Sequence, residues 1–142
     1  MTAPHPHRQL VRQGPHLDRL FADGAAATIS DERGATLVTI VRHVEPKVAS
    51  LDTLTVFAVD GEIDVDTAPL LQAALMGALD GHDAVCCDLS HVTFFGAAAA
   101  NTLFAAYRHA AARERTFLVR GAHGMTELVL TAVDPDGLIA WR

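Results

Sequence analysis

The stretch His91-Val-Thr-Phe-Phe-Gly-Ala-Ala-Ala-Ala-Asn-Thr-Leu103 decides how the rest of the chain is interpreted. It follows the apolar run AVCCDL at 84–89 and leads into apolar residues at helical spacing, so it predicts a buried strand, a tight connection and a helix over 97–114. The start of a helix presents unpaired N–H groups and the positive end of the helix dipole. Gly96 and the alanines after it supply no nucleophile, acid or base. The stretch is therefore predicted to hold an anion or to meet a partner, and not to catalyse a reaction.

Working outward, the hydrophobic spacing predicts an α/β chain in the order β-β-α-β-α-β-α-β. The predicted strands are 36–44, 54–59, 84–89, 116–120 and 138–141, and the predicted helices are 67–79, 97–114 and 125–133. Helices between strands imply parallel pairs, whereas the first two strands are expected to form an antiparallel hairpin with a long loop over 45–52. The last helix is expected to turn Met125, Leu128, Val129 and Ala132 inward.

An acidic segment separates the second strand from the first helix. It contains Asp60, Glu62, Asp64 and Asp66, a spacing that superficially resembles a calcium loop. The internal glycine and the later bidentate Glu of such a loop are missing, so no metal site is expected. Asp66 or Thr67 can cap the following helix, and an acidic contact patch explains the remaining carboxylates.

The acidic segment that begins at Asp60, followed later in the chain by the stretch 91–103, resembles the STAS domain, the anti-sigma factor antagonist (anti-anti-sigma factor) family of bacteria. Asp60-Gly-Glu-Ile-Asp-Val-Asp-Thr-Ala-Pro69 is similar to the family's Gly-Glu-Leu-Asp…Thr-Ala stretch. The family's phosphorylatable loop reads aromatic or apolar, Asp, Ser/Thr, Ser, Gly, and then a helix. Here Phe95 fits the apolar position, Gly96 replaces Asp, Ala97 replaces the first hydroxyl residue and Ala98 replaces the phosphoacceptor serine.

The resemblance covers residues 36–142 and implies a STAS-like fold, a mixed β-sheet with packed helices. In the family, a partner serine kinase phosphorylates the loop serine, and the unphosphorylated antagonist binds that kinase/anti-sigma factor and frees the sigma factor. The chain is accordingly expected to sequester an anti-sigma factor/serine kinase without a phospho-switch at Ala98. Thr93 and Thr102 are considered as alternative phosphate acceptors.

The resemblance also suggests a contact surface built from two loops at one end of the domain. Exposure of Phe94 or Phe95 would support this surface, and burial of both would leave them only a role in the core. The expected partner-binding residues are Glu62, Ile63, Asp64 and Asp66 from one loop, and Phe95, Gly96, Ala97, Ala98 and Asn101 from the other.

Composition narrows the remaining classes of function. The 142 residues carry a formal net charge of −6, which argues against nucleic acid as the main partner. No run of roughly 18 apolar residues predicts a membrane span, and residues 1–15 lack the apolar core of a signal peptide, so the cytoplasm is expected. Cys86 and Cys87 are interpreted as buried structural thiols, with redox regulation left open. No cofactor is expected.

Residues 1–35 are expected to form an N-terminal extension before the domain at 36–142. Within it, 1–15 is predicted to be disordered, His16–Ala22 to form a short helix, and 23–34 to be a linker. The oligomeric state is left open, with a homodimer among the alternatives.

Two other functions compete with the antagonist interpretation. The chain could be a small-ligand-sensing STAS module or a transporter-associated one. An enzyme is the least favoured, because its best case would combine His91 with Asp64 or Asp88 and no substrate or cofactor motif accompanies them.

Overall fold

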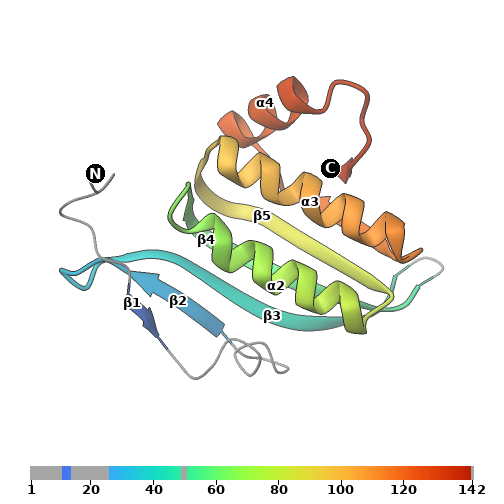
Figure 1. The fold of residues 1–142 in the computed structure, drawn as a ribbon, viewed down its shortest axis with the longest axis horizontal. Coiled ribbons are helices and arrows are strands. Elements are labelled where there is room, and N and C mark those ends of the chain that lie inside the picture. Colours follow the sequence, from blue (N-terminus) through green and yellow to red (C-terminus); the bar gives the residue numbers. More distant parts are fainter. Residues whose placement is uncertain (1–10, 14–25, 49–50, 142) are drawn as a thin grey trace.

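A mixed sheet with helices packed on it forms the body of the molecule (Figure 1). The structure is a computed structural model and describes residues 11–13, 26–48 and 51–141. The strands are β1 (Val11–Gln13), β2 (Ala26–Ser30), β3 (Thr36–Val48), β4 (Leu51–Ile63), β5 (Ala84–Phe95), β6 (Thr116–Arg120) and β7 (Ala140–Trp141). The helices are α2 (Ala68–Gly81), α3 (Ala97–Ala112) and α4 (Gly124–Val133). From β3 onward this order is the predicted one, and the predicted α/β class with a mixed sheet and packed helices is confirmed.

The strands lie in the sheet in the same order as in the chain, from β1 to β7. Neighbours up to β4 are antiparallel, and those from β4 onward are parallel. The change falls where helices begin to connect the strands, because only a crossover connection returns the chain in the same direction.

The two faces of the sheet differ in what covers them. Alternate residues of β4, such as Phe57 and Val59, join a core with α2, α3 and Leu130 of α4, and we call this side the first face. Leu54 and Val56, which point to the opposite side of β4, form a smaller buried cluster with Ala84 and Cys86 of β5. No helix residue of the described ranges belongs to this cluster, and we call this side the second face. In Figure 1, α2 and α3 lie side by side across the first face.

The hairpin of β3 and β4 is longer than predicted. Only residues 49–50 separate the strands, so the long loop expected over 45–52 is wrong. Pro46 lies inside β3, opposite Thr53. The strand tolerates this proline because β2 pairs with β3 only as far as Val41, which leaves the far half of β3 at the sheet edge.

The linker predicted over 23–34 is also wrong for Ala26–Ser30, which forms β2 and buries Ala27 and Ile29. β2 joins β3 through a tight turn in which the Asp31 carboxylate accepts hydrogen bonds from the N–H groups of Arg33 and Ala35. Disorder is likewise wrong for Val11–Gln13, which pairs with β2. The helix expected over 16–22 lies outside the described residues, and the domain boundary at residue 36 stays a prediction.

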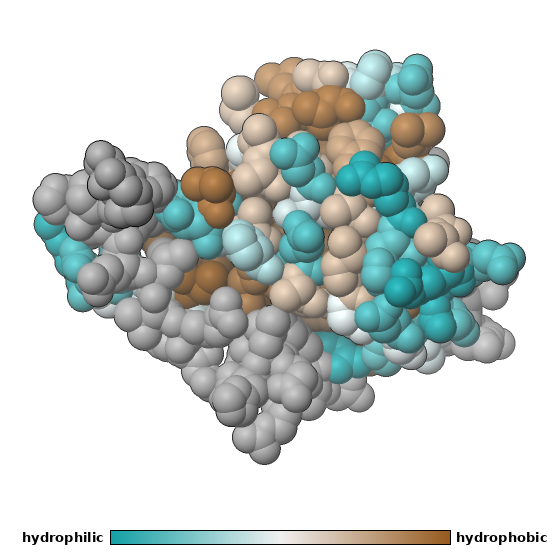
Figure 2. All heavy atoms as spheres, in the orientation of Figure 1, coloured by the Kyte–Doolittle hydropathy of each residue, from teal (hydrophilic) through white to brown (hydrophobic). Residues whose placement is uncertain are grey.

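The last helix turns a different side inward from the one predicted. Met125 and Leu128 are 72% and 63% exposed, Ala132 is also exposed, and Val129 is partly buried. Thr126 and Leu130, four residues apart, face the core instead. Because the apolar arc of α4 is wider than its contact with the rest of the molecule, part of it stays outside. Figure 2 shows hydrophobic residues gathered on the surface over α4.

Candidate partner-binding site

The two segments that the sequence singled out meet at the ends of β4 and β5. These parallel strands place Glu62 beside Phe94 and Ile63 beside Phe95. The N–H of Gly96 then donates a hydrogen bond to the carbonyl of Ile63 at 3.1 Å. The strand ends, the turn after β4 and the start of α3 therefore form one continuous surface.

A hydrogen-bonded turn joins β4 to α2. Asp64 Oδ1 accepts hydrogen bonds from the N–H groups of Asp66 and Thr67 at 2.9 and 3.1 Å. Thr67 Oγ1 accepts a bond from the N–H of Asp64 at 3.0 Å and donates one to the carbonyl of Glu62 at 2.7 Å. Asp64 thus holds the turn in shape, while Val65 at its tip is 64% exposed. Thr67 occupies the N-cap position of α2 without a capping bond from its side chain, contrary to the sequence interpretation.

The start of α3 is flat and uncharged. Gly96 is its N-cap residue, and the first turn has no acidic side chain and no side-chain cap. Ala97 is exposed and Ala98 is half-buried, whereas Ala99 and Ala100 pack in the core. Asn101, one turn further on, is exposed. The backbone at this helix start is therefore open to a partner without any reactive side chain.

Two of the predicted contact residues face the wrong way. Ile63 and Phe95 are only 1% and 5% exposed, because both point into the core between the first face and the helices. Their assignment to the contact surface is wrong for their side chains. Glu62, Asp64 and Asp66 are half-buried, and Glu62 lies at the end of a strand instead of in a loop.

Phe94 is the aromatic residue that the surface presents. It is 51% exposed and, as the neighbour of inward-facing Phe95, it points to the second face. Alternation from Val85, Cys87 and Leu89, which face the core, already places Phe95 inward and Phe94 outward. The register with β4 shifts twice, between Ala58 and Asp60 and between Gly61 and Glu62, so that Val92 also faces the core. One bulge inverts the alternation of inward and outward side chains, and the second restores it before Phe94 and Phe95.

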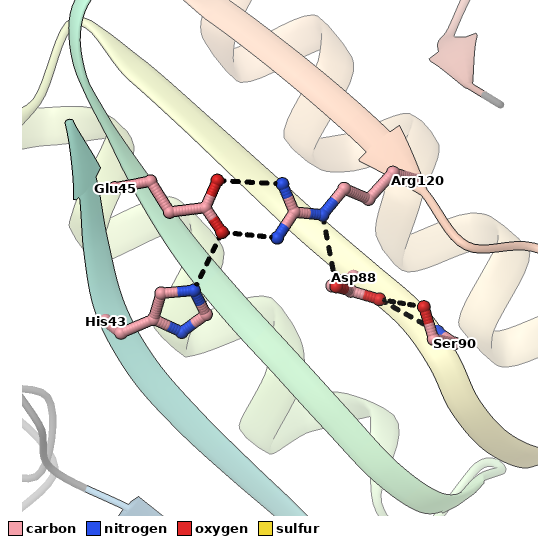
Figure 3. A network of polar contacts seen from close by, with 5 residues as sticks. All are labelled: His43, Glu45, Asp88, Ser90 and Arg120. Carbon is pink, nitrogen blue, oxygen red and sulfur yellow. Dashed lines mark hydrogen bonds and ion pairs between the residues drawn. The ribbon is translucent and has the colours of Figure 1, made fainter. Parts of the chain in front are cut away.

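A polar network covers part of the second face (Figure 3). Arg120 of β6 binds both carboxylate oxygens of Glu45 on β3, and its Nε donates to Asp88 Oδ2 at 3.1 Å. His43 donates to the same Glu45 carboxylate at 3.0 Å. The hydrogen bonds from Arg120 and then His43 lower the pKa of Glu45 to about 2. The network ties the far end of the hairpin to the middle of the sheet.

The contacts of Asp88 and Asp64 also bear on the alternative that the chain is an enzyme using His91 with one of these carboxylates. Asp88 Oδ1 accepts hydrogen bonds from the N–H and hydroxyl of Ser90 at 2.9 and 2.6 Å, and its other oxygen pairs with Arg120. The Asp64 carboxylate is held in its own turn. Neither carboxylate is placed to orient His91, which is exposed beside Asp60.

Comparison with known proteins identifies the family. A protein-family model described as "Mlab, STAS domain" matches residues 47–140. The chain belongs to the STAS domain family. No curated protein matches it. In the part of the STAS chain that the structure describes, no helix combines the length and hydropathy needed to cross a membrane.

Solved structures with the STAS fold agree. An anti-sigma factor antagonist from Mycobacterium paratuberculosis is 29% identical with a TM-score of 0.59, over 72% of this chain and 84% of that one. The Bacillus cell fate determinant SpoIIAA in its phosphorylated form is 11% identical with a TM-score of 0.53, over 71% of this chain and 90% of that one. SpoIIAA in its unphosphorylated form gives the same identity and TM-score, with 71% and 86% covered. At 11% identity, SpoIIAA supports the fold alone.

Proposed function

We propose that this STAS chain is a non-enzymatic cytoplasmic regulator that sequesters an anti-sigma factor/serine kinase and so frees a sigma factor. The observation that carries the proposal is the continuous surface of Phe94, the acidic turn and the uncharged start of α3. The 29% identical relative is named an anti-sigma factor antagonist, which supports the same role. The partner would touch Glu62, Asp66, Ala97 and Asn101 around Phe94, while Asp64 keeps the turn in shape.

The proposed function includes the loss of the phosphorylation switch at position 98. Ala98 has no hydroxyl group, and no acidic residue within 96–100 imitates a phosphate. A phosphate would add about two negative charges beside the partner surface and would oppose binding. The chain therefore keeps the electrostatic state of an unphosphorylated antagonist.

The two alternative phosphate acceptors, Thr93 and Thr102, differ in their exposure to solvent. Thr102 is 2% exposed inside α3, so a kinase cannot reach it in the folded protein, and its candidacy is withdrawn. Thr93 is exposed at the bulge of β5 and remains the alternative position for a phosphate.

The test combines binding with intact-mass analysis. The purified protein is mixed with candidate anti-sigma kinases of its own organism, with and without ATP, beside an Ala98→Ser variant. We expect the wild-type protein to bind equally in both conditions and to gain no mass, and the variant to gain one phosphate and to bind more weakly with ATP. Phosphate on Thr93 of the wild-type protein would show that the switch has moved, and binding to none of the kinases would refute the proposed function.

A further inference from the structure

We propose that Phe94 is the anchor of the partner surface and that the partner presents an apolar pocket bordered by arginine or lysine side chains. This inference rests on the proposed function and specifies the chemistry of the partner. It extends the surface from the start of α3 past the ends of β4 and β5 to the second face.

The first argument is that Phe94 is held in place as well as exposed. A Cβ atom built on Gly96 would lie 3.1 Å from the Phe94 ring, so the ring rests closely against the glycine that begins α3. One side of the ring is thereby supported while 51% of the residue stays open to solvent. A supported aromatic side chain loses little conformational freedom when it is bound, which is typical of the few residues that dominate an interface.

The second argument is the charge around the ring. Glu62 lies beside Phe94, and Asp60 lies on the same strand beside His91. In the ranges that the structure describes, the carboxylates of Asp60 and Glu62 have no side-chain hydrogen bond or ion pair. No lysine or arginine occurs within 60–67 or 91–101 to neutralise them.

Together these features define the partner. An aromatic side chain next to unpaired carboxylates fits an apolar pocket with positive charges at its rim, because opposite charges steer two proteins into register and like charges exclude the wrong ones. Arg120, the cation of the polar network on the second face, is already bound to Glu45 and Asp88.

The experiment measures association and dissociation rates with the anti-sigma kinase at several salt concentrations. Phe94→Ser should weaken binding at least about tenfold, mainly through faster dissociation. Leu128→Ser on α4 removes an apolar side chain that is 63% exposed and that the proposal does not include in the interface, so it should leave binding unchanged. The double variant Asp60→Asn/Glu62→Gln should associate several-fold more slowly and with a weaker salt dependence.

The outcomes separate the two proposals. If wild-type protein binds no kinase, the proposed function fails, and the inference falls with it. If wild-type protein binds and Phe94→Ser binds equally well, only the anchor is overturned. An association rate that is insensitive to salt and to neutralisation of Asp60 and Glu62 would overturn the basic border. Thermal unfolding of each variant confirms that it is folded.

Discussion

Gly61 shows why one position in the acidic segment has to be a glycine. Its φ of +114° lies in the region that favours glycine, and a Cβ atom there would lie only 2.3 Å from the carbonyl oxygen of Leu37. We expect Gly61→Ala to lower the free energy of unfolding by about 2 kcal/mol or more, measured by urea denaturation. Gly77→Ala in α2, where the added methyl meets nothing within 4 Å, should instead raise it by about 0.5 kcal/mol. Equal stability of Gly61→Ala and wild-type protein would contradict the close approach of β3.

Glu45 gives the network on the second face a pH dependence. Its pKa is lowered from 4.5 to about 2, so its contribution to stability is complete above pH 4.5 and is lost as the pH falls through 2. Because the Glu45 and Arg120 side chains are 27% and 37% exposed, solvent screens the pair, and we expect Glu45→Gln to cost about 1 kcal/mol at pH 7. The difference should vanish near pH 2 in urea titrations. Glu127→Gln on the exposed side of α4 is the matched control, and an equal cost there would refute the assignment.

At the scale of the element, the two apolar sides of α4 differ in how much they contribute to stability. Leu130 is fully buried and Leu128 is 63% exposed, although both are leucines in one helix. We expect Leu130→Ala to cost about 3 kcal/mol of unfolding free energy and Leu128→Lys to change it by less than about 0.5 kcal/mol. Chemical denaturation of the two variants checks this. A large loss of unfolding free energy in Leu128→Lys would support the sequence prediction that Leu128 faces inward.

The elements also show where sequence reasoning stops. Alternation and helical spacing predicted the order from β3 to α4, because those elements bury apolar residues at regular spacing. β7 was predicted as the last short apolar run of the sequence. β2 was missed because it has only two buried hydrophobic positions, Ala27 and Ile29, in a polar segment. The extent of β3 was missed because Pro46 signals a break everywhere except at a sheet edge.

The sequence and the family resemblance predicted which two segments meet in the candidate site, but not which of their side chains are exposed. The pairing of the acidic segment with the alanine-rich helix start followed from the family resemblance, and the parallel register of β4 and β5 brings the two together. Alternation from the apolar residues Val85, Cys87 and Leu89 would have placed Phe94, and not Phe95, on the outside. The inward position of Val92 could not be predicted, because it depends on bulges that local sequence does not announce.

At the scale of the whole molecule, the sheet shields both thiols. Cys86 and Cys87 point to opposite faces and are 1% and 0% exposed. Burial raises the pKa of the Cys86 thiol to about 11 and that of Cys87 well above its usual value. We expect neither to react with iodoacetamide at pH 8 in the folded protein and both to react in urea, measured by intact mass. Rapid labelling of Cys86 in the native state would reopen redox regulation.

The agreement between strand order in space and strand order in the chain has a consequence for how the protein is made. Each strand that leaves the ribosome finds the preceding strand already at the growing edge, so the sheet can extend in the direction of synthesis without waiting for a later segment to insert. The β3–β4 hairpin, closed by two residues, should form first because its contacts are local. Pulse-labelled hydrogen exchange during refolding should therefore protect the β3–β4 amides before those of β6 and β7, and the reverse order would contradict stepwise growth. A nascent chain that assembles in this way exposes one unfinished strand edge at a time, which limits its opportunities to aggregate before it is complete.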